Sequence, residues 1–191
     1  MGNLSVIGGK AKGFSLQSVP GTGTRPIMSM VKAAVFNIVS PYILGSTWLD
    51  LFAGTGSVGI EALSRGASLA RFVENQNMAV KTIRANLEHT GLLEEAEIWQ
   101  KNVFTLLKEP ADRRFDFIYV APPQFKDLWS QAVYDLDQNP DWLVDDSWIL
   151  VQIDRVEYKD LELDNLKLFD RRTYGNTELV FYMVKEGVVE S

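Results

Sequence analysis

Hydrophobic and polar positions follow a repeating order along residues 46–153, in which short apolar runs alternate with segments of helical spacing. The predicted strands are Thr47–Phe52, Leu69–Glu74, Ala96–Trp99, Phe115–Val120 and Ser147–Ile153. The predicted helices between them are Ser57–Arg65, Asn77–His89, Phe104–Lys108 and Lys126–Leu136. Strands that alternate with helices favour right-handed crossovers and a mostly parallel sheet covered on both faces.

The two ends of the chain depart from this order. Two short extended runs flank Gly8-Gly9-Lys10 and predict an N-terminal hairpin or arm over residues 1–24. Leu166–Lys185 predicts two strands around Tyr174-Gly175-Asn176, at least one of which runs antiparallel. We therefore predict an arm at 1–24 followed by one α/β domain at 25–191.

A helix is expected to open at Thr24-Arg25-Pro26, because threonine is a plausible N-cap and proline is tolerated in a first turn. Met28, Val31, Val35 and Ile38 follow at helical spacing and predict one buried stripe. Pro41 and Gly45 then predict its end.

Composition excludes several kinds of chemistry. The 191 residues include no cysteine, so disulfides, thiolate zinc sites and a cysteine nucleophile are ruled out. The single histidine, His89, cannot form a two-histidine metal site within one chain. No apolar run approaches the length of a membrane span, and the glycine-rich segment Met1–Gly13 does not resemble a secretory signal. We expect a soluble globular monomer with no metal and no membrane partner.

Charge is unevenly distributed along the chain. The net charge is −6, but residues 1–49 contain no acidic residue and carry Lys10, Lys12, Arg25 and Lys32. An anionic partner such as RNA could therefore be met by the N-terminal segment. The alternative is a polar arm without a binding role, because four charges in this length form only a thin patch.

A glycine-rich loop follows the first predicted strand. Gly54, Gly56 and Gly59 have the G-x-G-x-x-G spacing, and Glu74 ends the next strand. This arrangement is typical of a site for an adenosine-containing ligand, in which the acidic residue accepts hydrogen bonds from ribose hydroxyls. The spacing alone leaves NAD and other adenosine ligands open.

Asp50 favours one of these ligands. Its carboxylate lies four residues before Gly54, where it would repel a pyrophosphate. S-adenosylmethionine has no phosphate and carries a sulfonium and an ammonium, which a carboxylate favours. We therefore prefer S-adenosylmethionine to NAD as the ligand, with an NAD-dependent oxidoreductase as the lesser alternative.

The fourth predicted strand runs into Ala121-Pro122-Pro123-Gln124-Phe125. Ligands of open parallel sheets bind beyond the carboxyl ends of the strands, and a Pro-Pro pair fixes the backbone there. Rigid carbonyl acceptors would suit the exocyclic amine of a base, and an aromatic ring could stack on that base. The alternative is a proline-rich connection without chemistry.

These segments resemble the bacterial 16S ribosomal RNA guanine-N2 methyltransferase family, within the class I S-adenosylmethionine-dependent methyltransferases. The likeness covers nearly the whole chain. It rests on the opening Ile7-Gly-Gly-Lys-Ala-Lys-Gly, the helix containing Val31-Lys-Ala-Ala-Val-Phe-Asn, the segment Leu49–Ala67 and the Pro-Pro loop.

The resemblance implies a three-layer Rossmann-like fold with seven strands, the last antiparallel. It places the donor contacts on the loop after the first strand, on the end of the second strand and after the third strand. These candidate cofactor residues are Asp50, Phe52, Ala53, Gly54, Thr55, Gly56, Glu74, Asn75, Asn102 and Val103. The implied product is S-adenosylhomocysteine. The amine acceptors fall on position 121 and the carbonyl of Pro122.

The chain departs from the family pattern at two catalytic positions. The family has Asp or Asn, then Pro-Pro, then Tyr or Phe, whereas this chain has Ala121 and Gln124 at the outer positions. We hypothesise that Phe125 supplies the stacking ring and that Gln124 replaces the lost acceptor. Such variants are similar to cyanobacterial and plastid branches of the family, which implies a bacterial cytoplasm or, in a eukaryote, the plastid stroma.

The resulting prediction is methyl transfer from S-adenosylmethionine to the exocyclic N2 amine of a guanine in small-subunit (16S) ribosomal RNA. Lys10, Lys12 and Arg25 are the candidate RNA-binding residues. The substrate would be the RNA or a partly assembled small subunit. The non-catalytic alternative is a methyltransferase fold that binds RNA or assists ribosome assembly, because Ala121 lacks a side-chain acceptor.

Overall fold

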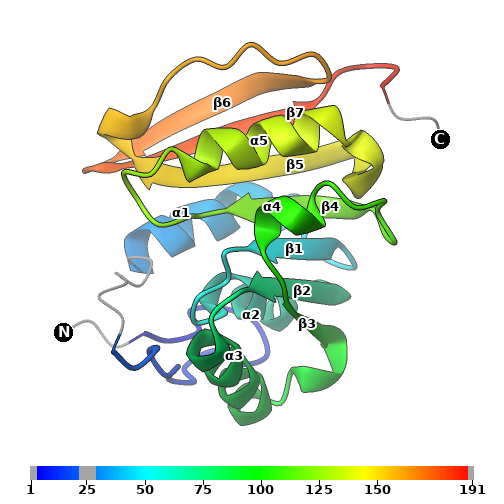
Figure 1. Cartoon of the computed structure of the whole chain (residues 1–191). Coiled ribbons are helices and arrows are strands. Elements are labelled where there is room, and N and C mark those ends of the chain that lie inside the picture. The colour runs from blue at the N-terminus through cyan, green and yellow to red at the C-terminus, as the bar shows by residue number, and fades with distance from the viewer. Residues whose placement is uncertain (1–3, 22–28, 189–191) are drawn as a thin grey trace. The chain divides into compact units, whose positions relative to one another are not determined.

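The computed structural model describes residues 4–21 and 29–188 (Figure 1). The chain divides into two compact units, Met1–Lys101 and Asn102–Ser191, which are described separately below. The predicted boundary at residues 24 and 25, the predicted helix start and Met28 lie outside the described residues.

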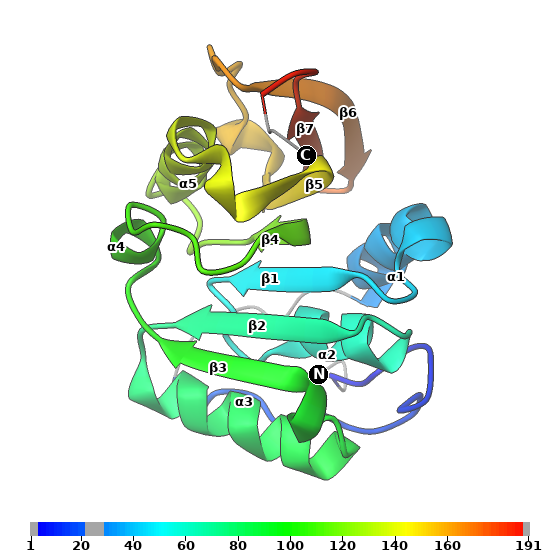
Figure 2. The ribbon, with the colours of Figure 1, turned by 90° about the vertical axis from the view of Figure 1, so that its right-hand side faces the viewer.

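Unit 1 contains three parallel strands in the order β3-β2-β1. They are β1 (Thr47–Leu51), β2 (Leu69–Glu74) and β3 (Ala96–Gln100). Helix α2 (Ser57–Ser64) packs against β1 and β2, and α3 (Asn77–Thr90) packs against β2 and β3. Figure 2 shows the three strands running in the same direction, so their carboxyl ends share one edge.

Burial explains why β1 and β2 read as continuous apolar runs. From Trp48 to Leu51 and from Ala70 to Val73 every residue is buried, including Asp50 and Arg71. Strand β3 is only half-buried along its length. A strand buried on both faces loses the alternation of polar and apolar residues.

Helix α1 (Ser29–Val39) buries a broader stripe than the spacing predicts. Val31 and Val35 are buried as expected, but Ile38 is only half-buried and Val39 takes its place. Lys32 and Phe36 are also fully buried on this helix. The predicted stripe is therefore wrong at its C-terminal end, because the helix turns Val39 rather than Ile38 toward the core.

The N-terminal segment, residues 4–21, is packed against the rest of unit 1. An isolated antiparallel bridge joins Ser5 and Ser15. The Val6 amide also donates to the Phe14 carbonyl at 2.9 Å and the Leu16 amide to the Leu4 carbonyl at 2.7 Å, so these residues form a short hairpin. The turn of this hairpin docks on the end of α2, where the Lys10 amide donates to the Ser64 carbonyl at 2.8 Å. Val6 and Ala11 are buried. The described part of the predicted arm is therefore docked on α2, where the Ala11 amide also donates to the Ser64 hydroxyl at 2.9 Å.

Unit 2 contains four strands in the order β4-β5-β7-β6. They are β4 (Phe115–Val120), β5 (Leu143–Asp154), β6 (Leu166–Tyr174) and β7 (Thr177–Val184). Strands β4 and β5 are parallel, whereas β7 runs antiparallel to both of its neighbours. The predicted antiparallel strand is confirmed. The unit also contains α4 (Val103–Leu106) and α5 (Leu128–Gln138), of which α5 packs against β5.

Strand β5 begins four residues before the predicted start. Ser147 causes the difference, because its hydroxyl accepts from the Val144 amide at 2.7 Å and donates to the Phe115 carbonyl at 2.5 Å. The pairing with β4 shifts register at this place. The exposed residues Asp145 and Asp146 interrupt the apolar pattern there, so sequence reasoning placed the strand start after them.

The described residues contain neither a membrane-spanning helix nor a cluster of metal-binding side chains. No helix within residues 4–21 and 29–188 is long and apolar enough to cross a membrane. Among the same residues, no group of three or more histidine, aspartate or glutamate side chains could hold a metal ion.

Candidate functional site

Asp50 lies near the carboxyl end of β1 and is only 3% exposed. Its Oδ2 accepts a hydrogen bond from the Gly59 amide at 3.1 Å, in the first turn of α2. Burial raises the pKa of Asp50 to about 8; the Gly59 bond opposes this rise and the nearby Glu74 carboxylate adds to it. A cation beside Asp50 would lower this pKa again, so cation binding at this site is coupled to the loss of a proton.

Glu74 ends β2 and faces the same loop. Its Oε2 accepts from the Gly54 amide at 3.0 Å, and its Oε1 accepts from the Asn75 and Gln76 amides at 2.8 and 2.9 Å. The backbone thus fixes both oxygens in position. Each oxygen of a carboxylate has two lone pairs, so Oε2, which accepts one amide bond, can accept one more, whereas the two amide bonds to Oε1 occupy both of its lone pairs.

The loop backbone requires glycine at particular positions. Gly54 and Gly56 have φ values of +56° and +77°, and Phe52 has the same unusual sign at +62°. A Cβ at Gly54 would meet only the Phe52 carbonyl, at 3.9 Å, so the loop offers open backbone there. A Cβ at Gly59 would lie 2.4 Å from the Phe72 ring, so α2 approaches β2 more closely than any side chain permits. Open backbone beside a fixed carboxylate fits an adenosine ligand.

Two buried polar side chains connect this loop to the N-terminal segment. Asn86 of α3 donates to the Thr55 carbonyl at 2.9 Å and to the Gln17 carbonyl at 3.1 Å, and it accepts from the Gln17 amide at 2.7 Å. Lys32 donates to the Ser57 hydroxyl at 3.0 Å and to the Ser5 carbonyl at 2.6 Å. Both side chains are 1% exposed or less.

Sequence reasoning missed Asn86 and Lys32 as parts of the site. The available signal was a polar residue on the apolar face of a helix, since Asn86 lies one turn after Ile83 and beside Leu87. Such residues are rarely buried without hydrogen-bond partners. Lys32 also pairs with Glu61 at 3.2 Å, and Glu61 in turn pairs with Arg65 at 2.8 Å.

Comparison with known proteins assigns the family. The family described as conserved hypothetical protein 95 matches residues 4–183. The chain belongs to this family. Among similar proteins, YlbH of Bacillus subtilis is 35% identical over 94% of this chain and 98% of the relative. The ribosomal RNA small subunit methyltransferase D of Haemophilus influenzae is 34% identical over 81% of this chain and 80% of that protein.

A solved structure supports the fold assignment. The protein yhhF from Escherichia coli has a TM-score of 0.85 and 27% identity, and the match covers 96% of this chain and 99% of that one. The resemblance to the small-subunit methyltransferase family and the predicted Rossmann-like α/β class are thereby confirmed.

Asn102 and Val103 belong to unit 2, where Asn102 caps α4. Its Oδ1 accepts from the Phe104 and Thr105 amides at 2.9 and 3.2 Å. This capping uses the side-chain oxygen, so a contact with an adenine edge would depend on the Nδ2 donor. Val103 is buried. Capping is a structural role that sequence reasoning did not assign to Asn102.

In this chain the proline loop, residues 121–125, follows β4 in unit 2. Pro122 is buried and Ala121 half-buried, whereas Pro123 and Gln124 are exposed. Phe125 is 67% exposed and has a φ of +62°. The Gln124 side chain, predicted to replace the acceptor lost at Ala121, and the Phe125 ring, predicted to supply the stacking contact, are therefore both at the surface.

The three candidate RNA-binding residues have different surroundings. Lys10 is exposed but pairs with Glu95 at 2.5 Å. Lys12 is exposed on the docked turn. Arg25 lies outside the described residues. An exposed ion pair is cheap to break, so Lys10 stays available to exchange Glu95 for a phosphate.

Proposed function

We propose that this chain transfers a methyl group from S-adenosylmethionine to the exocyclic N2 amine of a guanine in small-subunit ribosomal RNA. The observation that carries the proposal is Glu74. Both of its oxygens are held by loop amides at the end of β2. A carboxylate fixed in this way keeps one acceptor site, on Oε2, in a defined position for a ribose hydroxyl. The family relationship to ribosomal RNA small subunit methyltransferase D supports the methyl-transfer class.

Bound S-adenosylmethionine supplies a methyl group activated by a positive sulfur. Glu74 would orient the ribose, and the open backbone at Gly54 would admit the methionine portion. Asp50 would lose its proton as the cationic ligand binds. No covalent intermediate with the protein and no metal is needed for a direct displacement.

On the acceptor side, the two N–H groups of the exocyclic amine need hydrogen-bond acceptors. Once the methyl–sulfur bond has broken and the methyl–nitrogen bond has formed, the positively charged nitrogen loses one proton to water. We assign this role to the carbonyl of Pro122 and to the side-chain oxygen of Gln124, with Phe125 as the stacking ring. A single well-placed group is worth about 2–4 kcal/mol of transition-state stabilisation. Gln124→Ala should therefore lower kcat while leaving the affinity for S-adenosylhomocysteine unchanged; equal kcat values would assign the acceptor elsewhere.

The central test is transfer of labelled methyl groups to small-subunit particles that lack N2-methylguanosine. Wild type and Asp50→Ala are compared, and calorimetry measures S-adenosylhomocysteine binding to both. Label in guanosine with wild type, lost in the variant, supports the proposal. Label in another nucleoside would keep the methyl transfer and change the base.

The same assay on protein-free RNA tests the form of the substrate. The net charge of −6 favours a particle in which basic proteins offset the RNA charge. Equal rates on both substrates would contradict this preference.

A second candidate function rests on Ala121, which has no side-chain acceptor where the family pattern has one. The chain would then bind the cofactor and RNA as an assembly factor without turnover. Tight S-adenosylhomocysteine binding with no label on any particle or RNA would support it. A thermal shift with NADH but not with S-adenosylhomocysteine would instead indicate an oxidoreductase.

A further inference from the structure

The backbone just after the Pro-Pro pair is unusual for the residues it contains. Phe125 and Asp127 have φ values of +62° and +54°, although both carry side chains. In the described part of the chain, Phe52 is the only other residue besides glycine with a positive φ. Such conformations persist only where surrounding contacts hold them, and they gather at functional sites.

Glu157, in the short helical turn Arg155–Glu157 after β5, holds the first of these residues. Its Oε1 accepts from the Phe125 amide at 2.7 Å, and its Oε2 accepts from the Asp154 amide at 3.3 Å. The second bond is one half of a capping box; in the other half, Asp154 Oδ1 accepts from the Val156 amide at 3.1 Å. One carboxylate therefore fixes the turn with one oxygen and the Phe125 backbone with the other.

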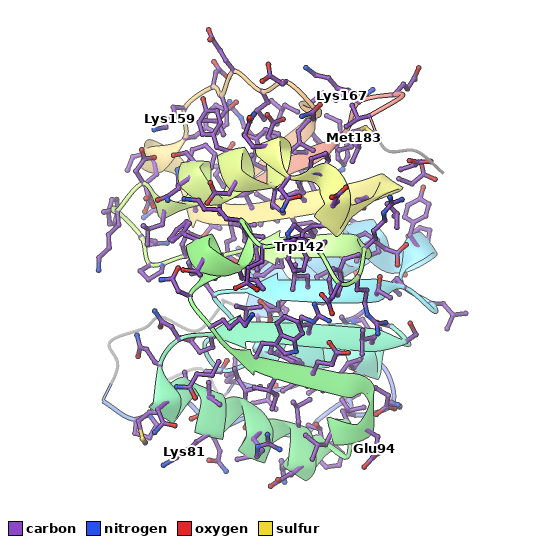
Figure 3. The ribbon with its side chains drawn as sticks, turned by 45° about the vertical axis from the view of Figure 1, so that its right-hand side comes forward. Lys81, Glu94, Trp142, Lys159, Lys167 and Met183 are labelled. Carbon is purple, nitrogen blue, oxygen red and sulfur yellow. The ribbon has the colours of Figure 1, made fainter. Side chains whose placement is uncertain are left out.

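Lys159 holds the second unusual residue. Its ammonium donates to Asp127 Oδ2 at 2.6 Å, and the Ser130 hydroxyl donates to Asp127 Oδ1 at 2.8 Å. These bonds lower the pKa of Asp127 below its usual range. In Figure 3, Lys159 lies at the surface at one end of unit 2, away from Lys167 and Met183. Residues 157–159 thus fasten residues 125–127 at two points.

The side chain carried by this fixed backbone is the exposed ring of Phe125. Phe125 is 67% exposed, so burial of its ring does not explain the strained backbone that carries it. A single exposed apolar residue needs no explanation by itself, but one fixed in a disfavoured conformation does. Unpaired RNA bases stack on exposed aromatic side chains.

We propose that Glu157 is a positioning residue that fixes Phe125 as the platform on which the target base stacks, with Lys159 as a second tie. The inference rests on the proposed methyl-transfer function, in which Phe125 is the stacking ring. It adds Glu157 as the residue that holds this ring in position. Glu157 acts through the Phe125 backbone and does not touch the base.

Two pairs of variants test the proposal in the methyl-transfer assay. Phe125→Leu removes the ring and should lower kcat/KM for RNA about tenfold or more, while Phe125→Tyr retains it. Glu157→Ala should reproduce most of that loss, and Glu157→Gln, which keeps an acceptor oxygen, should recover activity. Asp154→Ala is the matched control, because it removes the capping bond to Val156 and leaves the bond to Phe125.

A double variant separates positioning from a general structural role. If Glu157 acts through Phe125, Phe125→Leu combined with Glu157→Ala is no slower than Phe125→Leu alone. Multiplied losses, or equal losses in Asp154→Ala and Glu157→Ala, would overturn the proposal.

The hydrogen-exchange rate of the Phe125 amide tests the contact with Glu157 without requiring methyl transfer. The Phe125 amide should be protected in wild type and Asp154→Ala, and it should exchange faster in Glu157→Ala. If exchange follows this pattern but wild type transfers no methyl group, the positioning contact stands and the proposed function fails. If the amide exchanges equally in all three proteins, the positioning contact itself is wrong.

Discussion

The glycine loop of unit 1 follows the buried strand β1, and the proline loop of unit 2 follows the buried strand β4. The two loops are held in place by different kinds of contact. In the glycine loop, the carboxylates of Asp50 and Glu74 accept from backbone amides, and Asn86 and Lys32 add buried polar contacts. The proline loop is tied mainly by Glu157 and Lys159 near the surface.

This difference teaches where each loop can tolerate change. A loop built on buried backbone contacts loses stability when any of its parts is altered. A loop held by exposed side chains can change its residues at little cost to folding, which fits the departures at Ala121 and Gln124. The glycine loop is thus constrained by folding more strongly than the proline loop is.

The largest expected effect follows from Lys32→Met. The variant leaves the buried Glu61 with one cationic partner fewer and removes the bonds to Ser5 and Ser57. Breaking a buried pair costs about 3 kcal/mol or more of unfolding free energy. Denaturant unfolding measures this loss, with the exposed Lys12→Met as control. If the two variants were equally stable, the glycine loop would not depend on buried polar contacts for its stability.

Gly59→Ala should cost about 2 kcal/mol, because the new Cβ would overlap the Phe72 ring. It should also weaken S-adenosylhomocysteine binding, since the amide that donates to Asp50 moves. Combining it with Phe72→Leu makes room for the methyl group and should return part of the stability. Additive losses in the double variant would show that steric overlap is not the cause.

Asp50→Asn should change the pH dependence of stability by about 1 kcal/mol or more between pH 5 and 9. The native pKa of Asp50, about 8, lies above the ordinary value, so the folded state keeps a proton that the unfolded chain loses near pH 4. The stability contribution is therefore present below pH 4 and is lost as the pH rises through 8. The variant, which still accepts from Gly59, should lose less stability over this range, and parallel unfolding curves would contradict the raised pKa.

The raised pKa of Asp50 also predicts that the protein releases protons when a cationic ligand binds. At pH 6.5, calorimetry of S-adenosylmethionine, which carries the sulfonium, in buffers of different ionisation enthalpy should show protons leaving wild type, and fewer leaving Asp50→Asn. Identical buffer dependence in the two proteins would mean that Asp50 does not sense the ligand's charge.

The smallest expected effect is that of Lys159→Met on stability. The pair with Asp127 is half-exposed, so its loss should cost about 0.5 kcal/mol or less. Lys167→Met, on β6, is the matched control. A large loss of stability would show that the proline loop is as deeply constrained as the glycine loop.

Much of this protein was determined by its sequence alone. Strands β2 and β4 begin and end at the predicted residues, because continuous apolar runs bounded by polar residues leave little choice of boundary. Gly54, Gly56 and Glu74 were predicted to form one site from the glycine spacing and the acidic residue that ends the next strand, and the Gly54 amide does donate to Glu74. Local pattern suffices where the determining contacts are close in sequence or imposed by the sheet.

Tertiary structure decided the contacts between distant segments. No local pattern indicates that Asn86 joins Gln17 to Thr55, that Ser147 starts β5 early, or that Glu157 reaches the Phe125 amide. Burial also altered the chemistry of Asp50, which sequence reasoning treated as a fixed negative charge. A carboxylate's pKa depends on how much water surrounds it, and only the folded chain determines that.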